Sequence, residues 1–172
     1  MKSKVYRIRL LPTVSSRDEG TSALRQAGDA VMVVRGVPRM LLLRCPCGCG
    51  DDLGINLDPR AGPAWRHYVR RGALTLYPSY WRASHCESHF ILWNNEIFWC
   101  DWDDYGYWEG GSELESAVLG AIPAEYITYE KLADRIGEVP WDVLKACYAL
   151  TRQKKIERHP DRRRGEFRKK SG

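Results

Sequence analysis

Residues 40–50, which read MLLLRCPCGCG, combine an apolar run with a cluster of cysteines and determine how the first half of the chain is interpreted. An apolar strand candidate, Met40 to Leu43, leads directly into three cysteines within five residues. Pro46, Gly48 and Gly50 allow the backbone to turn tightly around one ion. Thiolates and imidazole are the ligands that Zn²⁺ prefers, and a structural site needs four of them from segments that the fold brings together.

A second segment, Cys86-Glu87-Ser88-His89, supplies further ligands of the same kind. The candidate metal ligands are therefore five for four positions: Cys45, Cys47, Cys49, Cys86 and His89. The spacing from Cys86 favours His89 over His85, and the flanking glycines favour Cys47 and Cys49, but the choice of four stays open. The alternatives are buried, inert cysteines and a redox cluster. Asp51 and Asp52, which follow the cluster, do not favour redox chemistry because acidic neighbours do not lower a thiol pKa.

The rest of the first hundred residues predicts a β-rich module. Strand candidates rich in β-branched and aromatic residues are separated by turn signals and occupy residues 5–10, 30–34, 40–43, 74–77 and 90–93. Arg35 to Arg39 and Asn94-Asn95 are expected to close two hairpins. Residues 13–28 lack a clear period and predict a loop or a short, poorly packed helix. Cys100 is expected to be an ordinary core residue.

Beyond residue 112 the apolar period changes from two to 3.6. Leu132 and Ile136, then Val143, Leu144, Cys147 and Leu150, each fall on one face of a helix. Thr128 is a helix-start signal, Gly137 a stop signal, and Pro140 suits the first turn of the next helix. The fold class predicted is α+β: a β-rich zinc-binding module at 1–105, a linker at 106–112, and a small α/β domain at 113–172.

Composition limits the classes of protein that this chain can be. A length of 172 residues excludes a large multidomain enzyme, and an aromatic content of 11% excludes a disordered chain. No apolar run suits a membrane span or a secretory signal, so a cytoplasmic location is expected. The net charge of +5 is concentrated in residues 151–172, which hold ten Lys or Arg against three acidic residues. This basic tail predicts a polyanionic partner.

The motif order of the first half resembles a small family of bacterial and phage proteins. The residues that carry the resemblance are Arg44 to Gly50, Trp65, Leu74 to Ser79, Cys86 to Phe90 and the strand that ends at Phe98-Trp99-Cys100. The likeness covers about residues 28–102. It implies zinc binding and an occurrence near bacterial ubiquitin-like conjugation genes or in mobile elements, and it implies no particular reaction.

The second half resembles a winged helix. Helices are expected at 112–121, 129–136 and 141–152, a wing at 161–165 and a return strand at 166–168. In winged helices that bind DNA, the third helix enters the major groove and the wing contacts phosphate. The residues that would make such contacts here are Lys145, Arg152, Lys154, Lys155, Arg162, Arg163, Arg164 and Arg168. Trp141 and Asp142 at the start of the third helix are unusual for base readout. Their presence favours a protein partner as the alternative.

These observations favour a zinc-stabilised binding protein without catalysis of its own, whose winged helix contacts nucleic acid. The first alternative is an accessory or ligase-like component of a bacterial ubiquitin-like conjugation system that acts through protein contacts. A second alternative is a zinc-dependent hydrolase that uses Glu87 beside the metal ligands. No membrane and no small-molecule substrate are expected as partners.

Overall fold

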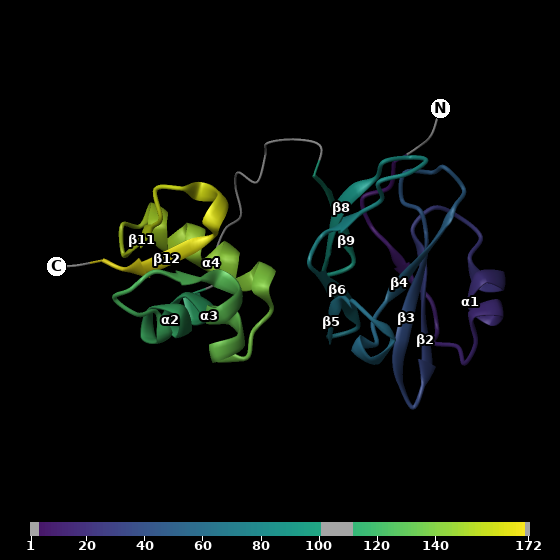
Figure 1. Ribbon diagram of the computed structural model, residues 1–172, viewed down its shortest axis with the longest axis horizontal. Coiled ribbons are helices and arrows are strands. Elements are labelled where there is room, and N and C mark those ends of the chain that lie inside the picture. Colours follow the sequence, from purple (N-terminus) through teal and green to yellow (C-terminus); the bar gives the residue numbers. More distant parts are fainter. Residues whose placement is uncertain (1–3, 101–111, 171–172) are drawn as a thin grey trace. The chain divides into compact units, whose positions relative to one another are not determined.

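The computed structural model describes residues 4–100 and 112–170 and divides the chain into two compact units, Met1–Trp102 and Asp103–Gly172 (Figure 1). It confirms the predicted α+β class, since helices and several small sheets occur in one chain. The predicted boundary at residue 105 and the linker at 106–112 lie outside the described residues, except for Ser112, which begins a helix. In the described part of the chain, no helix is long and apolar enough to cross a bilayer.

The described residues of the first unit form three sheets. The largest has the strand order β1 (Arg9–Leu10), β2 (Asp29–Arg35), β3 (Val37–Arg44) and β4 (Asp52–Asn56), with β1 parallel to β2 and the other pairs antiparallel. A two-stranded sheet pairs β5 (Arg66–Arg70) with β6 (Ala73–Tyr77). An antiparallel three-stranded sheet has the order β7 (Tyr80–Trp81), β8 (His89–Trp93) and β9 (Glu96–Trp99).

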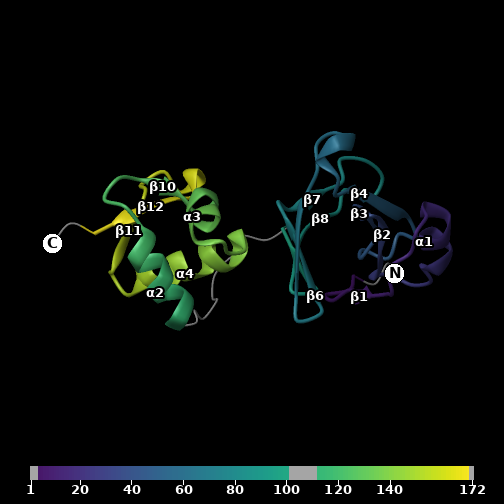
Figure 2. The ribbon, with the colours of Figure 1, turned by 90° about the horizontal axis from the view of Figure 1, so that it is seen from below.

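The four-stranded sheet lies on one side of the first unit and the two smaller sheets lie on the other (Figures 1 and 2). The core of the unit lies between them. Side chains alternate along a strand, so Ala30 and Met32 face this core while Val31 and Val33 face the other side of β2. The smaller sheets contribute residues that are almost fully buried: Leu74, Leu76, Phe90, Leu92 and Ile97. The two smaller sheets therefore cover one face of the four-stranded sheet.

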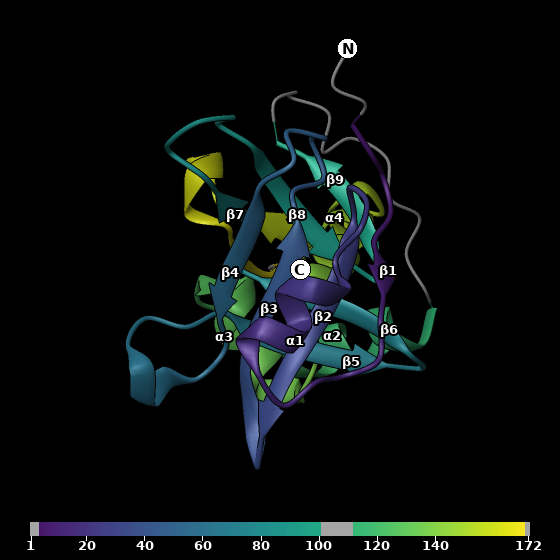
Figure 3. The same cartoon turned by 90° about the vertical axis from the view of Figure 1, so that its right-hand side faces the viewer.

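Helix α1 (Arg17–Ala23) covers the outer face of β2 and β3 (Figure 3). The Ser16 side chain caps it by accepting a hydrogen bond from the Glu19 peptide N–H at 3.2 Å. Gly20 is buried against the sheet, and a Cβ atom there would lie 2.6 Å from the Leu42 side chain. The sequence predicted a loop or a poorly packed helix here; the helix is short, but close contact at Gly20 seats it on the sheet.

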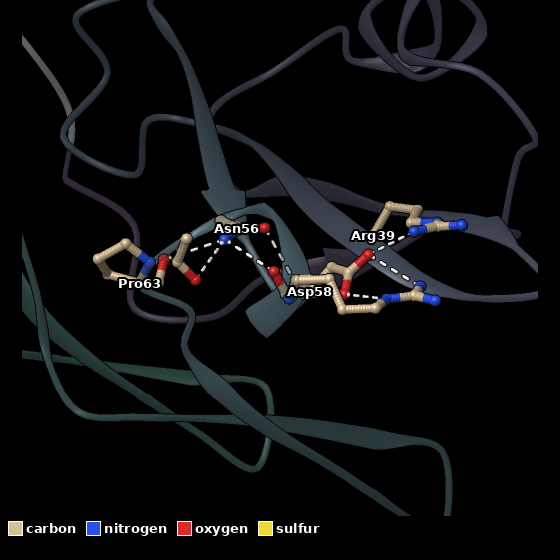
Figure 4. A network of polar contacts seen from close by, with 6 residues as sticks. Arg39, Asn56, Asp58 and Pro63 are labelled. Atoms are coloured by element: carbon tan, nitrogen blue, oxygen red, sulfur yellow. Dashed lines mark hydrogen bonds and ion pairs between the residues drawn. The ribbon is translucent and has the colours of Figure 1, made fainter.

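The loop after β4 is held by a polar network around Asp58, whose side chain is buried (Figure 4). The Asp58 carboxylate accepts hydrogen bonds from Arg39 and from the peptide N–H and guanidinium of Arg60. Asn56 donates to the carbonyl oxygens of Asp58 and Pro63, at 3.1 and 3.0 Å. The hydrogen bonds from Arg60 hold the pKa of Asp58 well below its usual range. This network fixes the loop that leads to Trp65.

The second unit contains α2 (Ser112–Ala121), β10 (Ile127–Thr128), α3 (Tyr129–Ile136), α4 (Pro140–Arg152), β11 (Ile156–Arg158) and β12 (Glu166–Lys169). The sheet order is β10-β12-β11, and the three helices lie beside this sheet (Figure 2). Thr128 caps α3 as expected, with its hydroxyl oxygen accepting from the Lys131 N–H, and Gly137 ends α3 in the left-handed conformation. The elements follow in the order expected from the sequence, and their interpretation as a winged helix stays a prediction.

We expect the Asp58 network to make the first unit sensitive to acid. Because the pKa of Asp58 is lower in the folded chain than in the unfolded chain, its contribution is present above the unfolded pKa of about 3.9 and is lost as pH falls below it. Asp58→Asn should lower the free energy of unfolding at neutral pH and reduce the loss of stability between about pH 5 and pH 2. Chemical denaturation at several pH values measures both effects. Equal pH dependence in the two proteins would contradict this assignment.

Candidate functional site

Four cysteine sulfurs lie together, three from the loop that follows β3 and one from the turn between β7 and β8. The Sγ atoms of Cys45, Cys47, Cys49 and Cys86 all lie within 4.8 Å of one another. Cys45 Sγ is 3.3 Å from Cys47 Sγ and 3.7 Å from Cys86 Sγ. These separations exceed the roughly 2.05 Å of a disulfide bond, and all four are free thiols.

The cluster has the size and donor chemistry of a tetrahedral metal site. Zn–S bonds of about 2.3 Å in a tetrahedron place the sulfurs roughly 3.8 Å apart, which falls within the observed range of separations. The structure thus brings four of the five predicted ligands together and could hold a metal ion there. The fifth candidate, His89, is not in this group.

Each half of the cluster lies in a loop with a constrained backbone. In the first loop, Gly48 and Gly50 have φ angles of 77° and 90°, which favour glycine, and the Gly48 N–H donates to the Cys45 carbonyl oxygen at 3.1 Å. In the second loop, His85 and Glu87 on either side of Cys86 also have positive φ angles, 63° and 51°. Such angles cost non-glycine residues of the order of 1 kcal/mol each. The second loop therefore needs contacts that hold it in place.

The environment gives the thiols different proton affinities. Burial raises the pKa of Cys45 and of Cys49. Burial alone would also raise the pKa of Cys86, but hydrogen bonds from the hydroxyl and peptide of Ser88 lower it to about 6. Ser88 Oγ lies 3.1 Å from Cys86 Sγ and 3.6 Å from Cys45 Sγ. Arg82, which pairs with Asp51 at 2.9 Å, links the two loops across the cluster.

His89 instead forms a pair with Ser79. Its Nε2 atom lies 3.1 Å from the Ser79 hydroxyl oxygen, and both side chains are half-buried. The paired register of β7 and β8 places Trp81 opposite His89 and Tyr80 opposite Phe90. Since side chains alternate along a strand, Ser79, Trp81 and His89 share one face of the sheet while Tyr80 and Phe90 enter the core.

The core side of this strand fixes the position of Ser79. Trp65 packs against Tyr80 with ring centroids 5.6 Å apart, and its indole Nε1 donates to the Ser79 carbonyl oxygen at 3.4 Å. The Trp65 peptide N–H in turn donates to the Asn56 carbonyl oxygen at 2.9 Å. The serine is thereby tied to the Asp58 network through Trp65.

A serine hydroxyl within hydrogen-bond distance of an imidazole nitrogen is the arrangement that activates a nucleophile. With Nε2 unprotonated, the hydroxyl donates to it and can transfer its proton during attack on a carbonyl carbon. The sequence analysis missed this pair because it assigned His89 to the metal. One signal in the sequence could have indicated the pair. Five candidate ligands for four coordination positions leave one residue available for another role.

Glu87, Cys100 and Cys147 are not part of the four-cysteine group. Glu87 is exposed, and four cysteine ligands would leave no open coordination position for hydrolysis beside it. Cys147 is fully buried, as expected of a core residue, and burial raises its pKa to about 12. Cys100 is only half-buried.

The basic residues of the second unit differ in how they are presented. Helix α4 is largely buried, so it presents little surface to a groove; its buried residues are Pro140, Trp141, Val143, Leu144, Ala146, Cys147, Ala149 and Leu150. Lys145, on the same helix, is half-buried, and Arg168 pairs with Glu157 at 2.6 Å. Among the residues predicted to contact nucleic acid, the exposed ones are Arg152, Lys154, Lys155, Arg162, Arg163 and Arg164. Nucleic-acid contact by these residues stays a prediction.

The first unit is thus a β-rich domain that combines a four-cysteine cluster with a serine–histidine pair. Residues 16–100 match the model of a family described as "Bacterial ubiquitination-like system serine protease (BubE)". This match spans the cluster and the pair, and it supports an association of the chain with a bacterial ubiquitination-like system. Neither the comparison with curated proteins nor the comparison with solved structures gives a match.

We expect the purified protein to bind one zinc ion per chain through the four cysteines. Cys86→Ser should remove most of the metal and lower the thermal midpoint by roughly 10 °C, because binding of a structural zinc contributes folding free energy. Metal analysis and thermal unfolding measure these effects. Cys100→Ser, a cysteine outside the cluster, is the matched control and should keep the metal. A metal-free wild-type protein with its fold intact would refute this prediction.

Proposed function

We propose that the first unit is a serine hydrolase that cleaves acyl bonds to a ubiquitin-like polypeptide within a bacterial ubiquitination-like system. The observation that carries this proposal is the 3.1 Å contact between Ser79 Oγ and His89 Nε2. The printed description of the matching family, which includes the words "serine protease", supports the same chemistry.

In this mechanism, Ser79 is the nucleophile and His89 the general base. The Ser79 oxygen attacks the carbonyl carbon of the substrate while its proton moves to His89 Nε2. His89 then donates that proton to the leaving amine or alcohol as the acyl–serine ester forms. A water molecule, deprotonated by His89, hydrolyses the ester and restores the Ser79 hydroxyl. Among the described residues, no carboxylate is hydrogen-bonded to His89, so the described pair is a dyad.

The developing negative charge on the substrate oxygen needs hydrogen-bond donors. The peptide N–H of Ser79 has no acceptor within the described residues, and Pro78 before it carries no N–H. Ser79 N–H is thus free to donate to an oxyanion at the nucleophile. We assign it this role in the proposed mechanism.

The four cysteines would hold zinc as a structural cross-link, because a tetrahedral site filled by protein ligands leaves no position for substrate. Cys86 lies in the turn that joins the strand after Ser79 to the strand that begins with His89. The Arg82 N–H also donates to the Ser88 carbonyl oxygen at 2.9 Å across this turn. The cluster would therefore stabilise the turn that positions the base against the nucleophile.

We expect an alkyl fluorophosphonate, which labels activated serines, to modify Ser79. Ser79→Ala should abolish the mass increase, and His89→Ala should slow it at least about 100-fold, as expected for the loss of a general base. Intact-protein mass spectrometry measures the reaction. Ser84→Ala is the matched control: Ser84 Oγ also lies near a ring nitrogen, 3.4 Å from His85 Nδ1, but both side chains are exposed, and this variant should keep the labelling of the wild type.

The same variants separate the two roles considered for His89. If His89 is the base, His89→Ala keeps the full metal content while losing labelling. Loss of metal in His89→Ala would return the residue to the metal site and contradict the proposed dyad. Absence of labelling in the wild-type protein, with metal bound and the fold intact, would refute the hydrolase proposal.

For the second unit we keep contact with nucleic acid as a separate proposal, favoured by three consecutive exposed arginines, Arg162 to Arg164, between β11 and β12. Replacing all three with Ala should weaken binding to every duplex sequence about equally. It should also flatten the dependence of log affinity on log salt by roughly one unit per lost phosphate contact. Binding titrations at two salt concentrations test this. An unchanged salt slope would exclude these arginines as phosphate contacts.

A further inference from the structure

Strand β7 lies at the edge of its sheet, directly after Ser79, and only β8 pairs with it in the described structure. In an antiparallel pair, residues alternate between those whose peptide groups face the partner strand and those whose peptide groups face away. The direction of each peptide group on β7 can therefore be assigned from the bonds that flank it.

Two hydrogen bonds fix this alternation. The Arg82 N–H donates to the Ser88 carbonyl oxygen at 2.9 Å, so Arg82 and Ser88 form a hydrogen-bonded pair. The next pair, Trp81 and His89, is then a non-hydrogen-bonded pair. Consistently, the His89 carbonyl oxygen accepts from Cys100 N–H on the opposite side, at 2.9 Å. The N–H and C=O groups of Trp81 thus point out of the sheet edge.

The side chain of Trp81 adds an apolar surface beside the reactive pair. Trp81 is 66% exposed, which is unusual for so large an aromatic residue. Its ring centroid lies 6.4 Å from that of His89, on the face of the sheet that also carries Ser79. A free peptide edge and an exposed indole therefore meet next to the proposed nucleophile and base.

We propose that the edge of β7 is the substrate-binding site for an extended polypeptide segment, which pairs with the Trp81 peptide group and packs a side chain on the indole. This inference rests on the proposed hydrolase function. Peptides commonly bind exposed sheet edges in this manner, with main-chain hydrogen bonds giving affinity and side-chain contacts giving selectivity. A segment whose main-chain groups are already paired within a helix or a sheet cannot bind in this way, so the substrate segment we propose is an extended, unpaired tail.

The main-chain pairing between β7 and a bound segment can involve few hydrogen bonds, so the expected effect of blocking one of them is small. β7 offers one outward-facing residue, so a bound chain gains at most two main-chain hydrogen bonds there. Blocking one of them should cost about fivefold in rate, which corresponds to the usual net contribution of a hydrogen bond. Only one N–H of the bound segment faces the Trp81 carbonyl oxygen, so sensitivity to N-methylation should be confined to one position.

The experiment compares two kinds of probe on the full chain. An alkyl fluorophosphonate tests only the serine–histidine pair, whereas a diphenyl phosphonate carrying three mixed-sequence residues also tests the edge. The second-order inactivation rate constant is measured for each. In the wild-type protein, N-methylation of one of the three amides should slow the peptidyl reagent about fivefold, and methylation of the others should have little effect. Trp81→Ala should lower the ratio of peptidyl to alkyl rate constants about tenfold.

Tyr6→Ala is the matched control, because Tyr6 is an equally exposed aromatic residue, 68% accessible, whose carbonyl oxygen accepts from the Ile97 N–H of β9, at the opposite edge of the sheet from β7; its ratio of rate constants should equal that of the wild type. Reaction with the alkyl reagent, combined with no effect of N-methylation and an unchanged ratio in Trp81→Ala, would overturn the edge site and leave the hydrolase proposal standing. Failure of both reagents would overturn the hydrolase proposal itself. A concentration-dependent dimer weakened by Trp81→Ala would show that a second copy occupies the edge and would also overturn this inference.

Discussion

The convergence of two loops on four cysteine sulfurs is the constraint on which the first unit depends. One loop ends β3 in the large sheet, and the other joins β7 to β8 in the small sheet. Two residues of the second loop, His85 and Glu87, adopt backbone conformations that are unfavourable for non-glycine residues. Zinc bound at Cys86, as we propose, would offset this cost and stabilise the turn between Ser79 and His89, whose Oγ and Nε2 atoms lie 3.1 Å apart.

Local sequence signals predicted the regular elements well where they were long or capped. The turn signals correctly indicated the β2–β3 and β8–β9 hairpins. Apolar periodicity, together with Thr128, Gly137 and Pro140, correctly indicated the three helices of the second unit. The strands of the first unit that the sequence did not predict are β4, β5 and β7. β4 contains Gly54 among its few residues, β5 begins and ends with arginine, and β7 is only two residues long, so their pairing depends on partners distant in sequence.

The site was only partly predictable, and His89 shows why. The ligand chemistry and spacing of Cys45, Cys47, Cys49 and Cys86 indicated a metal site, and the fold brings these sulfurs together. A Cys-x-x-His spacing fits a ligand equally well, so local sequence could not separate a metal ligand from a base. The strand register places His89 on the face of Ser79, and His89 is not in the group of four cysteines. Neither the amino-acid composition nor the hydrophobic periodicity of the sequence predicts that strand register.

The position of the serine–histidine pair within one hairpin has a genetic consequence. In many hydrolases the reacting residues come from distant parts of the chain, and recombination within the gene can separate them. Here Ser79 directly precedes β7 and His89 begins β8, with Trp81 between them in the sequence. A crossover anywhere outside the codons for residues 79–89 therefore keeps Ser79 and His89 together in one gene segment.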